Sequence, residues 1–230
     1  MAIYLSGDIH GTTNIDKLVE YFDENSLTEP CSKEDSYLII LGDCGVLWDD
    51  GEGDKSVKDI LDSLPVTVLW LDGNHENFDL INSYPVEMWH GGKVHRIHES
   101  IIHLMRGQIF EIDGLRFFVF GGGNSIDKYL RYERVNWWPE EMPSGREYEE
   151  GLVNLEAAGN KVDYILTHTC PREIAYEMSY YLKEGEEELQ QYLQRIADWN
   201  TFDEWYFGHW HRDEDIEQYH CLYDEIVQLV

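Results

Sequence analysis

Residue types that bind metal ions recur just after short apolar runs in this sequence. Five of six such runs are followed by these side chains, which are Asp8, His10, Asp43, Asn74, His75, His168, His209 and His211. Taken singly, a Gly-Asp after a strand is usually a turn, and a lone histidine is usually a hydrogen-bonded core or surface residue. Independent turns have no reason to share one choice of residue types. The repetition therefore predicts a metal site built from distant parts of the chain.

The spacing inside two of these segments also suits metal binding. Asp8 and His10 are separated by one residue, as are His209 and His211, so extended backbone would place each pair on one side, where it could hold one ion. A glycine precedes four of the candidate ligands, which allows tight turns close to an ion. Mixed aspartate, histidine and asparagine ligands suit manganese, iron or zinc.

The apolar runs predict the buried strands that would position these side chains. The expected strands are Ile3–Leu5, Tyr37–Leu41, Val66–Leu71, Phe117–Phe120, Tyr164–Leu166 and Trp205–Phe207. Apolar stripes predict helices near residues 12–25 and 186–200, Asp113-Gly114 predicts a hairpin, and residues 221–230 read as a further strand. Strands that alternate with helices predict a layered α/β fold, in which the carboxyl ends of the strands line a common crevice.

No repeat or linker divides the sequence, so residues 1–230 are expected to form a single domain. Residues 124–160 fit the alternating pattern least and are interpreted as a cap-like excursion over the sheet edge. The acidic run Glu184–Glu188 is interpreted as the solvated start of a helix.

The composition limits the partners of this chain. Its 46 acidic and 17 basic residues give a formal net charge of −29, which disfavours long nucleic acids because their binding relies on clustered lysine and arginine. The apolar runs are too short to span a membrane, and the start of the chain lacks the features of a signal peptide, so a cytoplasmic location is expected. The four scattered cysteines predict neither a disulfide framework nor a structural zinc site, and the oligomeric state is left open.

The motifs resemble those of the calcineurin-like metallophosphoesterases over residues 7–211. The matching segments are Gly7-Asp8-Ile9-His10-Gly11, Gly42-Asp43, Gly73-Asn74-His75-Glu76, Thr167-His168 and Gly208-His209-Trp210-His211. The resemblance implies a double β-sheet sandwich flanked by helices and two divalent or mixed-valence metal ions. It places one ion among Asp8, His10, Asp43 and His211 and the other among Asp43, Asn74, His168 and His209, with Asp43 between them.

Two such ions, roughly 3.5–4 Å apart, clamp phosphoryl oxygens, generate hydroxide near neutral pH and stabilise in-line displacement. The expected reaction is hydrolysis of a phosphomonoester or phosphodiester in a small phosphorylated substrate. By resemblance, His75 donates the proton to the leaving oxygen. The alternative for His75 is a purely structural histidine.

The sequence departs from the phosphoprotein phosphatases of this superfamily at two places. Asp43 is followed by Cys44-Gly45-Val46-Leu47 rather than by a further Asp and an Arg, so the usual carboxylate partner of the catalytic histidine is absent there. Asp49 or Asp50 could replace it. Asn77-Phe78 stands where an arginine is expected, which also disfavours a true phosphoprotein phosphatase.

Candidate substrate contacts follow the run Phe117–Phe120. The backbone amides of Gly121–Asn124 could approach a phosphate, with Lys128, Arg131 or Arg134 adding positive charge, although such residues are more often turns and solvated cations. The substrate-binding candidates are Asn124, Lys128 and Arg131.

Two other functions stay open from the sequence. One is a metal-dependent nuclease, which the site chemistry permits and the acidic charge disfavours. The other is a catalytically silent protein that uses the site for metal-dependent binding or as a scaffold.

Overall fold

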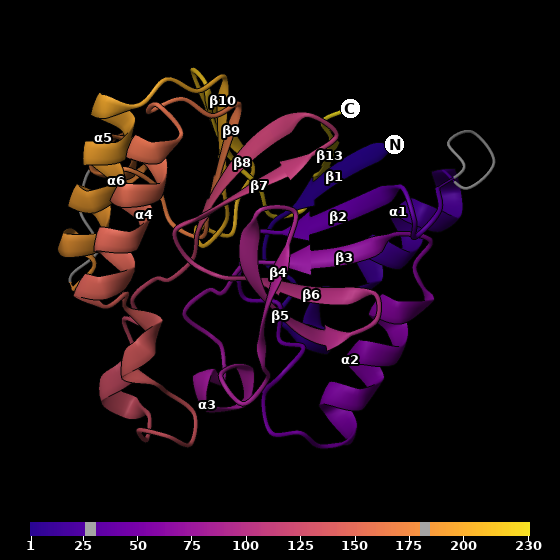
Figure 1. Cartoon of the computed structure of the whole chain (residues 1–230). Coiled ribbons are helices and arrows are strands. Elements are labelled where there is room, and N and C mark those ends of the chain that lie inside the picture. Colours follow the sequence, from indigo (N-terminus) through magenta and orange to yellow (C-terminus); the bar gives the residue numbers. More distant parts are fainter. Residues whose placement is uncertain (26–30, 180–184) are drawn as a thin grey trace.

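A computed structural model of the chain describes residues 1–25, 31–179 and 185–230. Two mixed β-sheets pack face to face, and helices cover the outer face of each sheet (Figure 1). The predicted α/β double sandwich flanked by helices is therefore confirmed. No helix in the described ranges is both long and apolar enough to cross a bilayer.

The first sheet has seven strands in the order β13-β1-β2-β3-β6-β5-β4. Their bounds are β1 (Ala2–Ser6), β2 (Ser36–Ile40), β3 (Thr67–Trp70), β4 (Val86–Trp89), β5 (Gly92–His98), β6 (Ile101–Leu104) and β13 (Ile226–Gln228). Strands β1, β2, β3 and β6 run parallel. All residues of β2 and β3 are buried, which explains why these strands are continuous apolar runs rather than alternating ones.

The second sheet has six strands in the order β11-β12-β10-β9-β8-β7. Their bounds are β7 (Gln108–Ile112), β8 (Leu115–Phe120), β9 (Tyr164–Thr167), β10 (Glu204–Phe207), β11 (Glu214–Ile216) and β12 (Tyr219–Cys221). Strands β8, β9 and β10 run parallel. The predicted hairpin joins β7 to β8, with Asp113 at φ 54° and Gly114 at φ 79°, as a tight turn of this composition requires.

The helices belong to two layers. Their bounds are α1 (Asp16–Asn25), α2 (Glu52–Ser63), α3 (Phe78–Ile81), α4 (Gly145–Ala157), α5 (Arg172–Ser179) and α6 (Glu187–Trp199). Helices α1 and α2 pack on the first sheet, and α4, α5 and α6 pack on the second (Figure 1). The helices expected near residues 12–25 and 186–200 are present as α1 and α6.

Helix α4 lies inside residues 124–160, the segment without clear periodicity. It begins with a capping box in which Ser144 and Glu147 satisfy each other's backbone groups, and its buried Leu155 packs under the second sheet. The role of residues 124–160 as a cap stays a prediction.

The single strand expected over residues 221–230 is wrong. β12 ends at Cys221 and β13 begins at Ile226. Between them, the Asp213 carboxylate accepts hydrogen bonds from the backbone amides of Tyr223, Asp224 and Glu225 at 2.7–3.2 Å. These amides are therefore engaged by a side chain instead of a neighbouring strand.

The core between the two sheets fixes their relative position. Leu5, Leu69 and Val94 of the first sheet pack with Phe117 and Leu166 of the second, and all five are at most 1% exposed. Interiors of this kind are close-packed and deform little. Side chains that leave the same edge of both sheets are consequently held at defined distances.

Candidate metal centre

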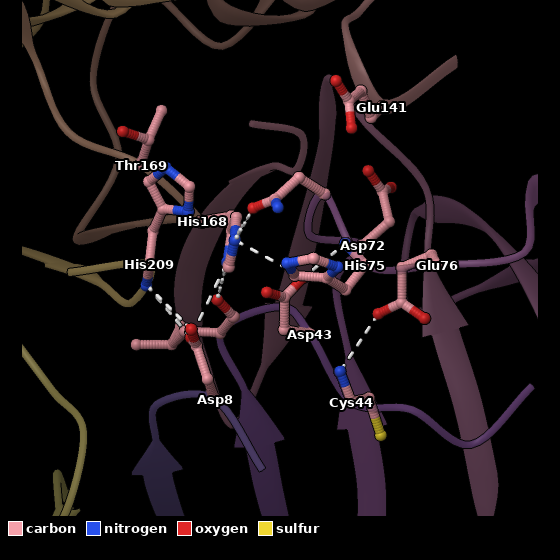
Figure 2. Close-up of polar contacts among 12 residues, drawn as sticks. Asp8, Asp43, Cys44, Asp72, His75, Glu76, Glu141, His168, Thr169 and His209 are labelled. Carbon is pink, nitrogen blue, oxygen red and sulfur yellow. Dashed lines mark hydrogen bonds and ion pairs between the residues drawn. The ribbon is translucent and has the colours of Figure 1, made fainter. Parts of the chain in front are cut away.

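The predicted ligands leave the carboxyl ends of five strands. Asp8, Asp43 and Asn74 follow β1, β2 and β3 of the first sheet, whereas His168 and His209 follow β9 and β10 of the second. The crevice therefore lies where the edges of the two sheets meet, and not at the edge of a single sheet. Figure 2 shows Asp8, Asp43 and His168 turned toward one another at this edge.

A first group of donors surrounds one carboxylate oxygen of Asp8. His211 Nε2 lies 3.1 Å from Asp8 Oδ2, and His10 Nε2 lies 3.8 Å from the same oxygen. The two imidazole Nε2 atoms are 3.0 Å apart. One ligand atom from each of the three residues falls within 4.8 Å of the others, a separation that suits binding to one ion.

A second group forms around His168, which is fully buried. Its Nε2 lies 3.1 Å from Asn74 Oδ1 and 3.6 Å from Asp43 Oδ1. Its Nδ1 lies 2.8 Å from the carbonyl oxygen of Leu41, so a proton on Nδ1 is donated there and Nε2 keeps its lone pair. Asp43 turns its other oxygen, Oδ2, to within 3.7 Å of His10 Nε2. This carboxylate therefore faces both groups.

His209 completes the second group. Its ring centroid is 4.7 Å from that of His168, and its backbone amide donates to Asp8 Oδ1 at 3.0 Å. In Figure 2 one ring nitrogen of His209 faces His168 and the other faces Thr169. The seven predicted metal ligands thus lie together, with His209 and His211 directed into different groups.

The backbone at these residues is not extended, so the expected geometry of the two closely spaced pairs is wrong. His10, Asp43, His209 and His211 have φ values of 48°, 45°, 68° and 50°, in the left-handed region that non-glycine residues seldom adopt. Each pair lies in a turn beyond its strand. Such conformations cluster at functional sites because the surrounding structure holds them there.

Two glycines give the ligands room. A Cβ atom on Gly42 would overlap the His168 ring, and one on Gly73 would overlap the Asp43 carboxylate and backbone amide. Gly42 also has a φ of 100°, which side chains rarely allow.

Burial and charge at the site match the requirements of bound cations. Asp8 and Asp43 are 0% and 1% exposed. Burial alone would raise the pKa of the Asp8 carboxyl, but the neighbouring His168 imidazole and a hydrogen bond from His211 hold that pKa well below its ordinary value. Two neighbouring buried carboxylates are costly unless positive charge offsets them. Carboxylates, imidazoles and one amide are also the donors that manganese, iron and zinc accept.

His75 lies beside the two groups and is half-buried. Its backbone amide donates to Asp43 Oδ1 at 2.8 Å, and its ring centroid is 5.5 Å from that of His10. Burial lowers the pKa of the His75 ring, although the charge of Asp43 opposes this.

Neither carboxylate suggested as a partner of His75 reaches its ring among the described contacts. Asp49 Oδ1 accepts a hydrogen bond from the amide of Gly51 at 2.8 Å, and Asp50 lies 3.7 Å from Lys58 Nζ. A different carboxylate, Asp127, lies close enough for the charge of His75 to lower its pKa, after the larger effect of its hydrogen bond to Arg131.

Two cavities open beside the metal-ligand groups. One, of about 370 Å³, is lined by His10, His75, Trp48 and Arg131 among others. The other, of about 290 Å³, is lined by Asp43, His209, Asn124 and Asp127 among others. The substrate candidates Arg131 and Asn124 therefore line the site, whereas Lys128 donates to Asn124 Oδ1 at 2.6 Å.

Comparisons with known proteins agree with this arrangement. The sequence profile described as calcineurin-like phosphoesterase matches residues 1–213. The chain belongs to the calcineurin-like phosphoesterase family. It is accordingly placed among the metal-dependent hydrolases that act on phosphoric ester bonds.

Solved structures share the fold of this calcineurin-like phosphoesterase at low sequence identity. The protein TT1561 of Thermus thermophilus is 10% identical, with a TM-score of 0.51 over 99% of this chain and 97% of that one. A putative 5'-nucleotidase from Staphylococcus aureus, solved in complex with alpha-ketoglutarate, is 14% identical, with a TM-score of 0.52 over 96% of this chain and 48% of that one. A search of curated proteins found no match.

Several buried polar residues of this calcineurin-like phosphoesterase support the ligands but were not anticipated. Ser125 Oγ accepts a hydrogen bond from Asn74 Nδ2 at 3.1 Å. Glu76 accepts one from the Cys44 amide at 3.0 Å, and burial raises the pKa of Glu76 well above its ordinary value (Figure 2). The sequence signals that could have found them are the place of Glu76 at the end of a matching motif and the place of Ser125 directly after Gly121–Asn124.

The interpretation of Glu184–Glu188 as a solvated helix start is wrong at Glu186, which is 0% exposed and faces His209. Glu184 lies outside the described residues. Glu187 and Glu188 are exposed at the start of α6, as expected. Composition alone does not show which glutamate of an acidic run is buried and which are exposed to solvent.

A buried charged network lies behind the turn that carries Asn74. Asp72 Oδ2 accepts a hydrogen bond from Arg106 Nε at 2.7 Å, and Asp72 Oδ1 lies 3.2 Å from His103 Nε2. His103 Nδ1 in turn lies 3.2 Å from His95 Nδ1. His95 and His103 are 3% and 4% exposed.

The His95 ring should make stability depend on pH. Burial, aided by the charge of His103, lowers the His95 pKa from 6.5 to about 4, while Asp72 opposes the shift. Below pH 6.5 the unfolded chain therefore binds a proton on His95 that the folded chain does not bind. The free energy of unfolding consequently falls as the pH is lowered from 6.5 to about 4. Urea unfolding of chelator-treated protein should show that His95→Gln removes about 1–2 kcal/mol of the loss in unfolding free energy between pH 7 and pH 5.

The matched control is His98→Gln, on the same strand but exposed. This variant keeps His95, so the loss of stability that His95 causes between pH 7 and pH 5 should persist in it. An identical pH dependence in wild type and His95→Gln would show that the folded chain accepts a proton on His95 as readily as the unfolded chain does.

Proposed function

We propose that this chain hydrolyses a small phosphoric ester with the help of two metal ions. Asp8, His10, Asp43 and His211 would hold one ion, and Asp43, Asn74, His168 and His209 the other. The observation that carries the proposal is the meeting of two donor groups, Asp8-His10-His211 and Asp8-Asp43-His168, each with one ligand atom per residue within 4.8 Å, beside His75 and two open cavities. Manganese, iron and zinc are the ions that fit the donor set.

When bound, the two ions would supply Lewis acidity for the phosphoryl oxygens and lower the pKa of a water molecule. The chain itself would orient the substrate. His75 would hold a proton near the leaving oxygen, at the side of the site where the cavity meets His10. Asn124 and Arg131 line two different cavities, both of which His75 also lines, and would contact the substrate beside His75.

The charge of the site favours a diester over a monoester. The described lining of the two cavities contains one arginine, Arg131, and no lysine. Both Arg131 Nε and Nη2 bond to the Asp127 carboxylate, at 2.8 and 2.9 Å. A phosphodiester carries one negative charge, whereas a monoester carries two near neutral pH, so the diester needs less neutralisation.

Replacement of Arg131 should weaken substrate binding. Loss of one charge-assisted contact predicts a KM about tenfold higher for Arg131→Ala, with a smaller change in kcat. Steady-state kinetics on bis(p-nitrophenyl) phosphate measures both. Arg134→Ala is the control, because Arg134 is exposed and pairs with Asp79 and Glu140. An unchanged KM for Arg131→Ala would remove Arg131 from the substrate site.

The segment between Asn124 and Trp138 would form a rim around the substrate. Ile126, Tyr129, Leu130 and Tyr132 are each at least 70% exposed. Ile126 lines the same cavity as Asn124. We propose that these apolar side chains contact the organic part of the ester, in keeping with the cap-like role expected for residues 124–160.

The deciding experiment is hydrolysis by the purified chain after treatment with chelator and return of manganese, iron or zinc. We expect metal-dependent turnover of p-nitrophenyl phosphate and of its bis ester, with the bis ester preferred. Nucleotides, cyclic nucleotides and phosphopeptides then define the substrate class. Turnover that survives chelation would contradict the metal-dependent mechanism.

Two other results would point to the competing functions. Rapid cleavage of single-stranded oligonucleotides would favour a nuclease. Tight manganese binding without turnover of any ester would favour a metal-dependent binding or scaffold protein.

A further inference from the structure

Glu186 is a fully buried carboxylate that lies against a candidate metal ligand. It occupies the N-cap position of α6, but its side chain does not cap that helix. Its Oε1 lies 3.0 Å from His209 Nε2. A carboxylate at the start of a helix usually remains in water near the free amides, so its burial here requires another explanation.

Three further donors fix this carboxylate. Oε1 accepts a hydrogen bond from the Asn124 amide at 3.0 Å. Oε2 accepts one from Thr169 Oγ1 at 2.9 Å and one from Gln190 Nε2 at 2.8 Å. Removal of a carboxylate from water is costly unless such bonds satisfy it. Both oxygens are therefore held in place, and Glu186 joins the loop after β8, the residue after His168, and α6.

Because Glu186 lies next to only one of the two ring nitrogens of His209, the two nitrogens have different roles. A carboxylate 3.0 Å from Nε2 favours the tautomer that carries its proton on that nitrogen, which leaves the lone pair on Nδ1. His168 is anchored in the same manner, since its Nδ1 lies 2.8 Å from the Leu41 carbonyl oxygen and its Nε2 is left to bind. His168 and His209 thus each have one ring nitrogen beside a protein oxygen.

We propose that Glu186 is a positioning residue for the second metal ion. It favours the Nε2–H tautomer of His209 and fixes the orientation of its ring. It also ties Asn124 to the same point, so the ion and one wall of the substrate cavity share a support. This inference rests on the proposed two-metal function, and acidic groups that act behind a ligating histidine typically change metal affinity 10- to 100-fold.

Manganese binding to metal-free protein, followed by calorimetry and electron paramagnetic resonance, tests the proposal. Glu186→Gln preserves the shape of the side chain but removes its charge. We expect the dissociation constant of the second ion to rise about 10- to 100-fold and that of the first to change less than about threefold. Unchanged affinities for both ions in a folded variant would overturn the proposal.

Glu141→Gln is the matched control. Glu141 is also a buried carboxylate, 1% exposed, and its Oε1 accepts a hydrogen bond from the amide of Ser125, next to Asn124. No histidine contact is recorded for it among the described residues. Glu141 reaches the ligand Asn74 only through Ser125, so Glu141→Gln should weaken the second ion less than Glu186→Gln does, and an equal loss in both variants would overturn the proposal.

A measurement on the unaltered chain covers the case in which Glu186→Gln does not fold. Long-range ¹H–¹⁵N spectra of metal-free protein with labelled histidine should show His209 as the Nε2–H tautomer, assigned by comparison with His209→Gln. The Nδ1–H tautomer would contradict the proposal. Wild-type protein that holds two ions without hydrolysing any ester refutes the proposed function alone, whereas protein that binds fewer than two ions refutes both.

Discussion

Asp43→Asn should lose at least about 10³-fold in kcat/KM, or ~4 kcal/mol of transition-state stabilisation. Asp43 is the carboxylate whose two oxygens face the two donor groups, at 3.6 Å from His168 and 3.7 Å from His10. An amide keeps the volume of the side chain but supplies one neutral oxygen. Metal analysis should therefore find fewer than two ions per chain, together with the loss of turnover of the bis ester.

The control for this substitution is Asp49→Asn in the same loop. Asp49 is exposed and bonds to the amide of Gly51, so its replacement should leave both metal content and kcat/KM within about twofold. Full activity in Asp43→Asn would refute a carboxylate shared by two ions. Loss of activity in Asp49→Asn would restore Asp49 as a partner of His75.

His75→Asn should lower kcat by about 10²- to 10⁴-fold while both metal ions remain bound. The ring of His75 faces the cavity shared with His10, but its contact with Asp43 is made through the backbone amide, which asparagine retains. The structure of the ligand groups should consequently survive the change. Kinetics and metal analysis on the same preparation separate this outcome from that of Asp43→Asn.

Esters with different leaving groups sharpen the test of His75. If His75 donates a proton to the leaving oxygen, the variant should lose most on alkyl esters, whose leaving groups are poor, and least on p-nitrophenyl esters. An equal loss on all esters would favour a structural His75. His98→Asn, at an exposed position, should not change kcat on any of them.

The strands that lead to the site could be predicted because they are simple in sequence. All residues of β2 and β3 are buried, so both strands appear as unbroken apolar runs that end at glycine or polar residues. The ligands directly after these runs stand out for the same reason. β4 has no buried residue, which explains why no apolar run in the sequence predicted this strand.

The local geometry of the ligands could not be predicted. A spacing of one residue between two ligands fits an extended strand, but it fits two successive turns equally well. His209 and His211 lie in turns, with φ values of 68° and 50°. Packing between distant loops selects these conformations. Histidine adopts positive φ more often than most non-glycine residues, but still only in a minority of cases, so residue type alone does not select these conformations.

The buried residue that holds His209 in place could not be predicted from the sequence either. Glu186 and Glu187 are neighbours of the same type, yet one is buried against His209 and the other is exposed. The difference depends on where α6 begins relative to the loop of Asn124. That relation is a property of the folded chain, which the order of residues in one segment does not reveal.

Because the candidate ligands come from both sheets, the core between the sheets sets the distances between the ligands in addition to stabilising the fold. A substitution at Phe117 or Leu69, which belong to the core rather than to the ligand groups, could shift one sheet relative to the other and would then separate the donors even if the fold remained stable. Shifts near 1 Å at a reacting centre can cost about 100-fold in rate. Mutational tolerance in this interior should thus be limited by catalytic alignment before it is limited by folding, so natural variation there would tune the enzyme without touching its active groups.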